Sequence, residues 1–350
     1  MPKIIIDPTS RILYASFYIE GLYQVFGKRN VAFSAKYFSD LKRDKEAFAF
    51  EHYFAFVLIN TDKKVTRYII DFCDPTDINS TAYHWCDYYA KINLDLEHDF
   101  NSQEKIISIP PGFGIKIWNH PETIYHCISN LIKCKSGLII PLKRFLRDYR
   151  EQLLRPKLDA YQTTKFPKNS SEKTPYIYLI ASLWQDKDSM SRTNLLRKQF
   201  IEICKSNNCD FEGGFFTSKD AAIPQGFEDF LFYKSYSTKA YVVKSILSKI
   251  VFNTPSVHKC HGWKLGEFLA MGKPILSTPI SNKLPEELIH GKHIHIATYE
   301  DELKAGVELL LSNNDYCDHL SENIKTYYEN FASPIAVIKN IVKVDPKLIP

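Results

Sequence analysis

The sequence has few of the features that mark a disulfide-rich, zinc-binding or membrane-spanning protein. None of its eight cysteines forms a Cys-x-x-Cys pair or a zinc-like repeat, so we expect most of them to be small buried hydrophobic residues. No segment approaches the roughly 18 uninterrupted apolar residues that a membrane-spanning helix needs. The first residues, MPKIIIDPTS, lack the basic region, apolar core and cleavage site of a secretory signal, and we therefore expect a cytoplasmic protein.

Three further absences narrow the function. No Gly-x-Gly-x-x-Gly motif follows the first predicted strand, which argues against a nucleotide-oxidising enzyme. The cations are not concentrated in one stripe, which argues against nucleic acid as a partner. No Asp-x-Asp pair stands in a metal-binding setting, because NLDLEHD (93–99) is typical of an acidic surface. We therefore expect no metal site and no cofactor, with helix N-termini and basic side chains acting where a cation would.

The composition is that of a globular protein. Of the 350 residues, 45% are hydrophobic and 24% are charged, and this length predicts about two domains. The formal charge of +5 comes from scattered lysines and arginines, which favours anionic ligands or a lipid surface as partners. Aromatic residues make up 14% of the chain, and we expect most of them to fill cores.

Short apolar runs separated by helical patterns fill the first part of the chain. They predict a buried parallel sheet with a β-α-β opening, in which residues 16–29 form the helix and Gly27 ends it. Residues 105–118 read as a strand that ends in a Pro- and Gly-rich loop. The predicted strands of this block are 3–7, 30–34, 54–60 and 66–71.

The same alternation restarts after a polar stretch with three prolines at 155–175, which predicts an interdomain linker. The fold class is therefore α/β, with two doubly wound, Rossmann-like domains that face a cleft. We expect an N-terminal domain (1–160), a linker (161–174), a C-terminal domain (175–325), and a final helix (326–350) that packs back on the N-terminal domain.

One segment stands where an open parallel sheet binds its ligands. SVHKCHGWKLGE (256–267) directly follows the predicted strand 250–255, and ligands bind at the carboxyl ends of such strands. Gly262 allows a close approach of the backbone, and Trp263 and Lys264 open a helix whose N–H groups favour phosphate. Glu267 lies on a different face of this helix from the apolar pair Leu265 and Leu269, where it could accept hydrogen bonds from a ribose diol.

The segment HGWKLGEFLAMGKPILST (261–278) resembles the nucleotide-sugar signature of GT-B glycosyltransferases. In that signature a Gly, four residues, a Glu, four residues and a Gly lead into an apolar strand, and Gly262, Glu267 and Gly272 fit the spacing. The resemblance implies that Glu267 binds the ribose hydroxyls of a nucleotide diphosphate sugar. The two α/β blocks and the final helix extend the resemblance over the whole chain. The resemblance implies that 1–160 is the acceptor-side domain and 175–325 the nucleotide-sugar-binding domain.

The chain departs from this family at one position. Many retaining members carry a second Glu eight positions before the ribose Glu, and here that position is Lys259, which favours inversion and could face the diphosphate. The family also places basic residues near the first strand of the second domain, to neutralise the leaving diphosphate. The loop 181–198 offers Lys187, Arg192, Arg197 and Lys198, of which Arg192 is our first choice. His261 is the histidine that we expect in the site.

An acceptor hydroxyl needs a general base, and in a two-domain cleft we expect it from the first domain. Asp71 and Asp74 follow a predicted strand there, Glu20 follows the first strand, and the sequence does not rank the three. The aromatic segment 84–94 could line an acceptor groove.

The resemblance therefore predicts a metal-independent glycosyltransferase. Its partners would be a nucleotide-sugar donor and a glycan or lipid-linked acceptor of surface polysaccharide or lipopolysaccharide synthesis, with peripheral contact to a membrane. Two alternatives stay open: a nucleotide-sugar epimerase on the same fold, and a noncatalytic nucleotide- or glycan-binding module.

Overall fold

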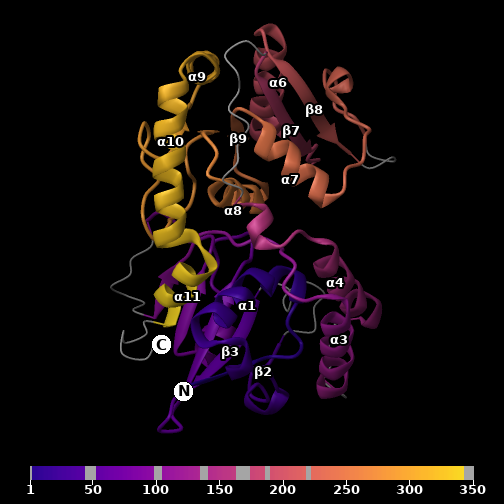
Figure 1. Cartoon of the computed structure of the whole chain (residues 1–350), viewed down its shortest axis with the longest axis vertical. Helices are drawn as coiled ribbons and strands as arrows, with labels where there is room; N and C mark the ends of the chain where they lie inside the picture. The colour runs from indigo at the N-terminus through magenta and orange to yellow at the C-terminus, as the bar shows by residue number, and fades with distance from the viewer. Residues whose placement is uncertain are drawn as a thin grey trace. The chain divides into compact units, whose positions relative to one another are not determined.

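The computed structural model describes residues 2–43, 53–97, 105–134, 141–162, 174–185, 190–217 and 222–342 (Figure 1). The chain divides into two compact units. Unit 1 comprises Met1–Leu158, Asn282–Glu286 and Glu329–Pro350, and unit 2 comprises Asp159–Ser281 and Glu287–Tyr328. The predicted linker 161–174 lies mostly outside the described residues.

Unit 1 is built on a six-stranded sheet in the order β2-β1-β3-β4-β5-β6. Its strands are β1 (Lys3–Ile6), β2 (Val31–Phe33), β3 (Tyr53–Ile59), β4 (Val65–Asp71), β5 (Tyr88–Lys91) and β6 (Ile106–Ser108). The sheet is mixed, which corrects the prediction of a parallel one: β3 runs antiparallel to both β1 and β4. The five residues between β3 and β4 make a hairpin, because a parallel crossover needs a dozen residues or more.

The helices of unit 1 are α1 (Ile12–Phe26), α2 (Ser80–Trp85), α3 (His120–Cys134), α4 (Leu142–Leu154) and α11 (Pro334–Val342). Helix α1 ends at Gly27, whose φ of 79° suits glycine, as the sequence predicts. Helix α11 packs against α1, although more than 300 residues of chain separate their starts. A Cβ at Gly21 would lie 2.3 Å from the carbonyl oxygen of Pro334, so the contact requires glycine there.

Unit 2 has only parallel strand pairs among its described residues. Strands β7 (Tyr176–Ser182) and β8 (Asp210–Phe216) pair with each other, and β9 (Val251–Asn253), β10 (Ile275–Ser277) and β11 (His295–Ile296) form a sheet in the order β11-β10-β9. The helices are α6 (Leu195–Ser206), α7 (Thr238–Leu247), α8 (Trp263–Met271), α9 (Glu300–Ser312) and α10 (Asn314–Tyr327). In the core, the rings of Phe200 and Phe252 stack at 4.4 Å.

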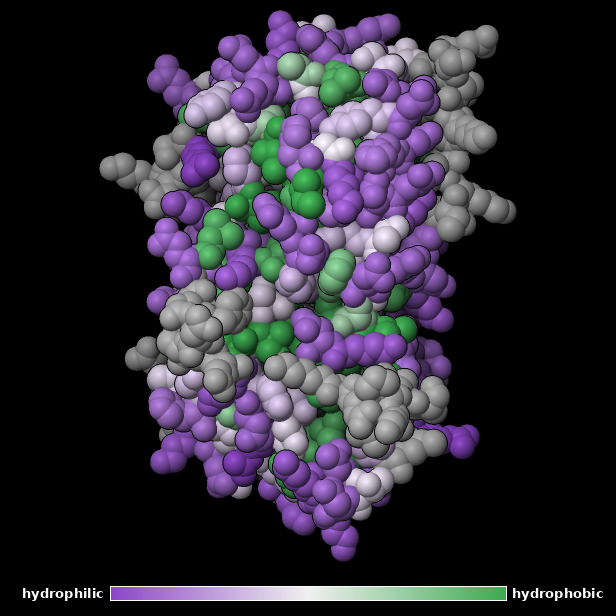
Figure 2. Space-filling model, turned by 90° about the vertical axis from the view of Figure 1, so that its left-hand side faces the viewer, coloured by the Kyte–Doolittle hydropathy of each residue, from purple (hydrophilic) through white to green (hydrophobic). Residues whose placement is uncertain are grey.

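The predicted α/β class holds, because strands alternate with helices in each unit. Helix α9 buries Leu303, Val307 and Leu310 on one face. Figure 2 shows the mainly hydrophilic surface on the side where α9 and α10 lie in Figure 1. No helix within the described ranges is long and apolar enough to cross a membrane.

Candidate functional site

The candidate site lies at the carboxyl ends of the strands of unit 2. Strand β7 ends at Ser182, strand β9 ends at Asn253, and helix α8 begins at Trp263. Because parallel strands end at the same edge of a sheet, ligands of open α/β folds bind there. The signature segment therefore stands in the place that the sequence predicts.

Arg197 of α6 brings a buried cation to this edge. The residue is 7% exposed; its Nε donates to the hydroxyl of Thr254 at 2.9 Å, and its Nη1 donates to the carbonyl oxygen of Ser182 at 3.2 Å. Burial lowers the pKa of Arg197 to about 10. In the part of the chain that the structure describes, no carboxylate forms an ion pair with this guanidinium. The guanidinium is charged at neutral pH and is held by two neutral groups.

Lys264 brings a second cation from the first turn of α8. The residue keeps some exposed surface, but its ammonium reaches inward and donates to the carbonyl oxygen of Ile180 on β7. Burial, reinforced by the positive charge of Arg197, lowers the pKa of Lys264 to about 7, although Glu267 opposes the shift. Arg197 and Lys264 donate to carbonyl oxygens two residues apart on β7, and Glu267 follows Lys264 by one turn of α8, so the three groups lie in one neighbourhood. With both cations charged they carry an excess of one positive charge.

Glu267 is buried, at 3% exposure. Its Oε2 accepts a hydrogen bond from the hydroxyl of Tyr241 on α7 at 2.9 Å. Burial raises the pKa of Tyr241 well above its usual value, and the charge of Glu267 adds to that effect. Glu267 stands one turn after Lys264, so both side chains share a face of α8. The local pattern separates Glu267 from the apolar pair of the helix but does not reveal that it is buried.

Gly262 precedes the first residue of α8, with φ −80° and ψ 164°, an extended conformation open to any residue. A Cβ there would meet only the Cβ of Ser256, at 3.8 Å. The fold itself therefore does not require this glycine, which leaves room for a ligand in front of the helix. Gly272, by contrast, ends α8 in the left-handed region at φ 62°, where glycine is favoured.

His261 and Lys259 lie in the loop before α8. His261 is buried, and burial lowers its pKa to about 4, so the ring is neutral at pH 7. It lines a small cavity together with Thr254, which follows β9, and Gly262, which precedes α8. Lys259 is exposed with a φ of 57°, and its carbonyl oxygen accepts from the hydroxyl of Ser281. Trp263, the first residue of α8, is partly buried.

The other basic residues that the sequence offers for the site differ from Arg197 in position and exposure. Arg192 is exposed, in the turn Met190–Asn194 that precedes α6. Lys187 lies outside the described residues. Lys198 is partly buried, and its Nζ lies 3.8 Å from Glu202. Of the basic candidates that the structure describes in this loop and helix, Arg197 is the one whose side chain hydrogen-bonds at the strand ends.

Asp71, a candidate base, is the centre of a closed network at the end of β4. It is 1% exposed, and its Oδ2 accepts from the hydroxyl of Tyr89 and from the Nζ of Lys91, the latter at 3.1 Å. Its Oδ1 accepts from the backbone N–H of Cys73 at 2.7 Å. A general base must reach its substrate, so this geometry favours a structural role for Asp71.

The two remaining carboxylates are more accessible. Asp74 is exposed in the loop after β4, and Glu20 is partly exposed on α1, where its Oε1 accepts from the side chain of Gln24 at 2.8 Å. In the described ranges, no group of three or more His, Cys, Asp or Glu residues has the arrangement of a metal site.

No protein-family model and no curated protein sequence matches the chain. Solved structures that resemble it include a glycosyltransferase from Rickettsia africae (12% identity, 76% of this chain and 67% of that chain, TM-score 0.38). They also include Anabaena HepE in complex with UDP (14% identity, 75% of this chain and 65% of that chain, TM-score 0.34). TarM is a further match (16% identity, 51% of this chain and 37% of that chain, TM-score 0.38). A protein assigned as UDP-N-acetylglucosamine 2-epimerase from Listeria monocytogenes matches the chain with the same TM-score as TarM (16% identity, 76% of this chain and 71% of that chain, TM-score 0.38). Such distant similarity carries no argument about activity.

Proposed function

We propose that the chain is a glycosyltransferase of GT-B type that binds a nucleoside diphosphate sugar at the strand ends of unit 2. The observation that carries the proposal is a pair of basic side chains beside the N-terminus of α8: the buried guanidinium of Arg197 and the inward-directed amino group of Lys264. Burying a charge costs free energy unless a counter-charge accompanies it. A diphosphate placed here would supply that counter-charge to both cations.

The same arrangement suits the chemistry of the leaving group. When the bond from the sugar to the diphosphate breaks, negative charge grows on the departing oxygen. Arg197, Lys264 and the N–H groups at the start of α8 are held in place before the reaction and would stabilise that charge. The diphosphate would leave without a metal ion, and Lys259 is a further cation of the loop that could reach it.

Glu267 has the role of binding the ribose in this proposal. Its buried carboxylate already accepts from one hydroxyl, that of Tyr241. A ribose diol offers hydroxyl donors of the same kind. Lys259 at the position of the second Glu supports inversion of the anomeric carbon, for which a single base must activate the acceptor. Asp74, exposed at the end of β4, is our first choice for that base, and Glu20 is the second.

Among acceptors we favour a lipid-linked one, from the surface of α3. Helix α3 exposes four large apolar side chains on one side of the helix: Ile124, Tyr125, Ile128 and Ile132. The adjoining α4 exposes Lys143, Arg147 and Arg150. Apolar side chains flanked by cations suit the surface of an anionic membrane, where a lipid-linked glycan of surface polysaccharide synthesis would be met.

Donor turnover tests the proposal. The purified chain is incubated with nucleoside diphosphate sugars, and release of nucleoside diphosphate and fate of the sugar are followed with and without glycan acceptors. Acceptor-dependent release supports a transferase. An altered sugar still attached to its nucleotide, without acceptor, would instead identify an epimerase, and tight binding without any turnover would identify a binding module.

A further inference from the structure

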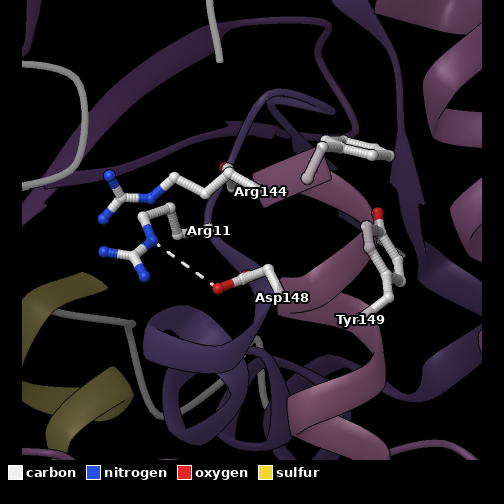
Figure 3. A pocket seen from close by; sticks show the side chains of 6 residues that line it. Arg11, Arg144, Asp148 and Tyr149 are labelled. Atoms are coloured by element: carbon white, nitrogen blue, oxygen red, sulfur yellow. Dashed lines mark ion pairs between the residues drawn. The ribbon is translucent and has the colours of Figure 1, made fainter. Parts of the chain in front are cut away.

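A second charged pocket lies in unit 1, between the loop after β1 and helix α4 (Figure 3). Its lining comprises Ser10, Arg11, Arg144, Phe145, Asp148 and Tyr149. Figure 3 shows the side chains of Arg11 and Arg144 extending in the same direction, with Asp148 directed toward Arg11. Nothing in the proposed donor site uses these residues.

Asp148 has a structural role in this pocket. Its Oδ2 accepts from the backbone N–H of Leu13 at 2.8 Å, so this carboxylate of α4 caps the N-terminus of α1. Its Oδ1 lies 3.5 Å from the Nε of Arg11. The lining thus contains two guanidinium groups and one carboxylate.

Ser10 provides an independent indication of a ligand. The residue is 3% exposed, and its hydroxyl has no hydrogen-bond partner in the described part of the chain. Leaving a buried hydroxyl unpaired costs about 1–3 kcal/mol. Most buried polar groups are paired with protein, water or ligand. The pocket is narrow, with room for about one water-sized group beside Ser10.

The pocket stands at the same sheet edge as the candidate base. Strands β1 and β4 run in the same direction, because each pairs antiparallel with β3. Their carboxyl ends therefore lie at one edge. The rings of Tyr14 on α1 and Phe72 after β4 are 5.7 Å apart, and the guanidinium carbon of Arg11 lies 4.1 Å from the ring centre of Tyr14. This contact links the pocket to the segment that carries Asp74.

We propose that Ser10, Arg11 and Arg144 bind an oxyanion of the acceptor, a phosphate or a carboxylate group. This proposal rests on the proposed transferase function, because only a transferase has an acceptor. The binding of an anion at this site can be tested independently of that function. One oxygen of the group fills the space beside the Ser10 hydroxyl, and the guanidinium groups hold the remaining oxygens at the mouth of the pocket. The acceptor is then an acidic molecule, bound in unit 1 near Asp74.

The test is a titration of the full-length chain with inorganic phosphate, followed by phosphorus NMR. The variants are Arg144→Gln, Ser10→Ala and, as a control with the same change of charge, Lys143→Gln at the neighbouring exposed position. All are repeated in an Arg197→Gln background, to remove phosphate binding in unit 2, and circular dichroism checks the fold. We expect affinity to fall about tenfold or more in Arg144→Gln and about threefold in Ser10→Ala. In Lys143→Gln it should change less than about twofold.

Equal affinity in the wild type and Ser10→Ala, or an equal loss in Lys143→Gln, would overturn the site, and Ser10→Ala keeps the test decisive where Arg144→Gln does not fold. Phenyl phosphate, glucuronate and neutral glucose distinguish the source of the oxyanion. Preference for the phosphate ester indicates a phosphorylated acceptor, preference for glucuronate indicates an acidic sugar, and no preference over glucose contradicts the proposal. Nucleoside diphosphate binding, measured in parallel, separates failure of this site from failure of the donor site.

Discussion

Two buried sites, one in each unit, differ in how their charges are neutralised. In unit 1, Asp71 is paired with Lys91, and both are at most 1% exposed, while Arg43 is paired with Asp7 at 2.5 Å. In unit 2, Arg197 is buried against a hydroxyl and a carbonyl oxygen, next to a second cation. A closed pair contributes to the fold and leaves no charge for a ligand. Cations without a matching number of carboxylates are the groups that a bound anion can complete.

The largest effect that we expect is on the stability of unit 1. Asp71→Asn leaves Lys91 buried without its counter-charge, which should cost about 3–5 kcal/mol of unfolding free energy. Urea unfolding measures it, with Asp74→Asn as the exposed control expected to change by less than about 0.5 kcal/mol. Equal stability of the two variants would mean that the Asp71–Lys91 pair does not stabilise the fold, which would contradict the role given to closed ion pairs in unit 1.

The pH dependence of nucleoside diphosphate binding tests the candidate site of unit 2. A bound diphosphate favours protonated Lys264, whose pKa is lowered to about 7 in the free protein. Binding must therefore take up a proton above pH 7, and affinity should fall by up to about tenfold per pH unit between pH 7 and 9. Calorimetry in buffers of different ionisation enthalpy measures the uptake. Lys264→Met should bind more weakly and lose this dependence; a wild type with flat affinity would remove Lys264 from the site.

A smaller effect distinguishes the ribose from the phosphates. Glu267→Gln keeps the size of the side chain but makes it a weaker hydrogen-bond acceptor for the ribose hydroxyl groups. Affinity for nucleoside diphosphates should therefore fall about tenfold. Affinity for inorganic pyrophosphate should stay the same or rise, because a nearby negative charge is removed. A matching loss for both ligands in isothermal titration would mean that Glu267 supports the fold or the phosphates rather than the ribose.

The smallest effect concerns the membrane. Ile128→Asp replaces an exposed apolar side chain of α3 with a charge and should reduce binding to vesicles with anionic lipid by about threefold or more. Leu309→Asp, at an exposed apolar position of α9 in unit 2, is the matched control. Sedimentation with vesicles compares them; equal binding of both variants and the wild type would leave α3 without this role.

Local sequence patterns predict much of this architecture. Gly27 and Gly272 end helices at positive φ, and the strand that follows Lys273-Pro274 begins where the apolar run predicts it. The antiparallel β3 was missed, although a connection of five residues to β4 is too short for a parallel crossover. Periodicity identifies a strand but does not give its direction.

The burial of Arg197 can be predicted from its spacing along the helix. Arg197, Phe200, Ile201 and Cys204 recur at the spacing of one buried helix face, and all four are buried. That spacing predicts that Arg197 points inward, whereas Arg192 precedes the helix and is exposed. Glu267 is buried and accepts a hydrogen bond from Tyr241 of α7, a tertiary contact that no local pattern contains.

The most direct test of the account compares two arginines five positions apart. Arg197→Gln and Arg192→Gln remove the same charge, one from the buried strand edge and one from an exposed turn. Thermal shift with UDP, GDP, CDP, ADP and dTDP identifies the nucleotide, and titration then gives its affinity. We predict a loss of about 100-fold in Arg197→Gln, a loss of less than about threefold in Arg192→Gln, and a folded protein in both. Equal affinity in Arg197→Gln and the wild type, or no nucleotide bound by the wild type, would contradict the central claim that the buried cations of unit 2 receive a diphosphate.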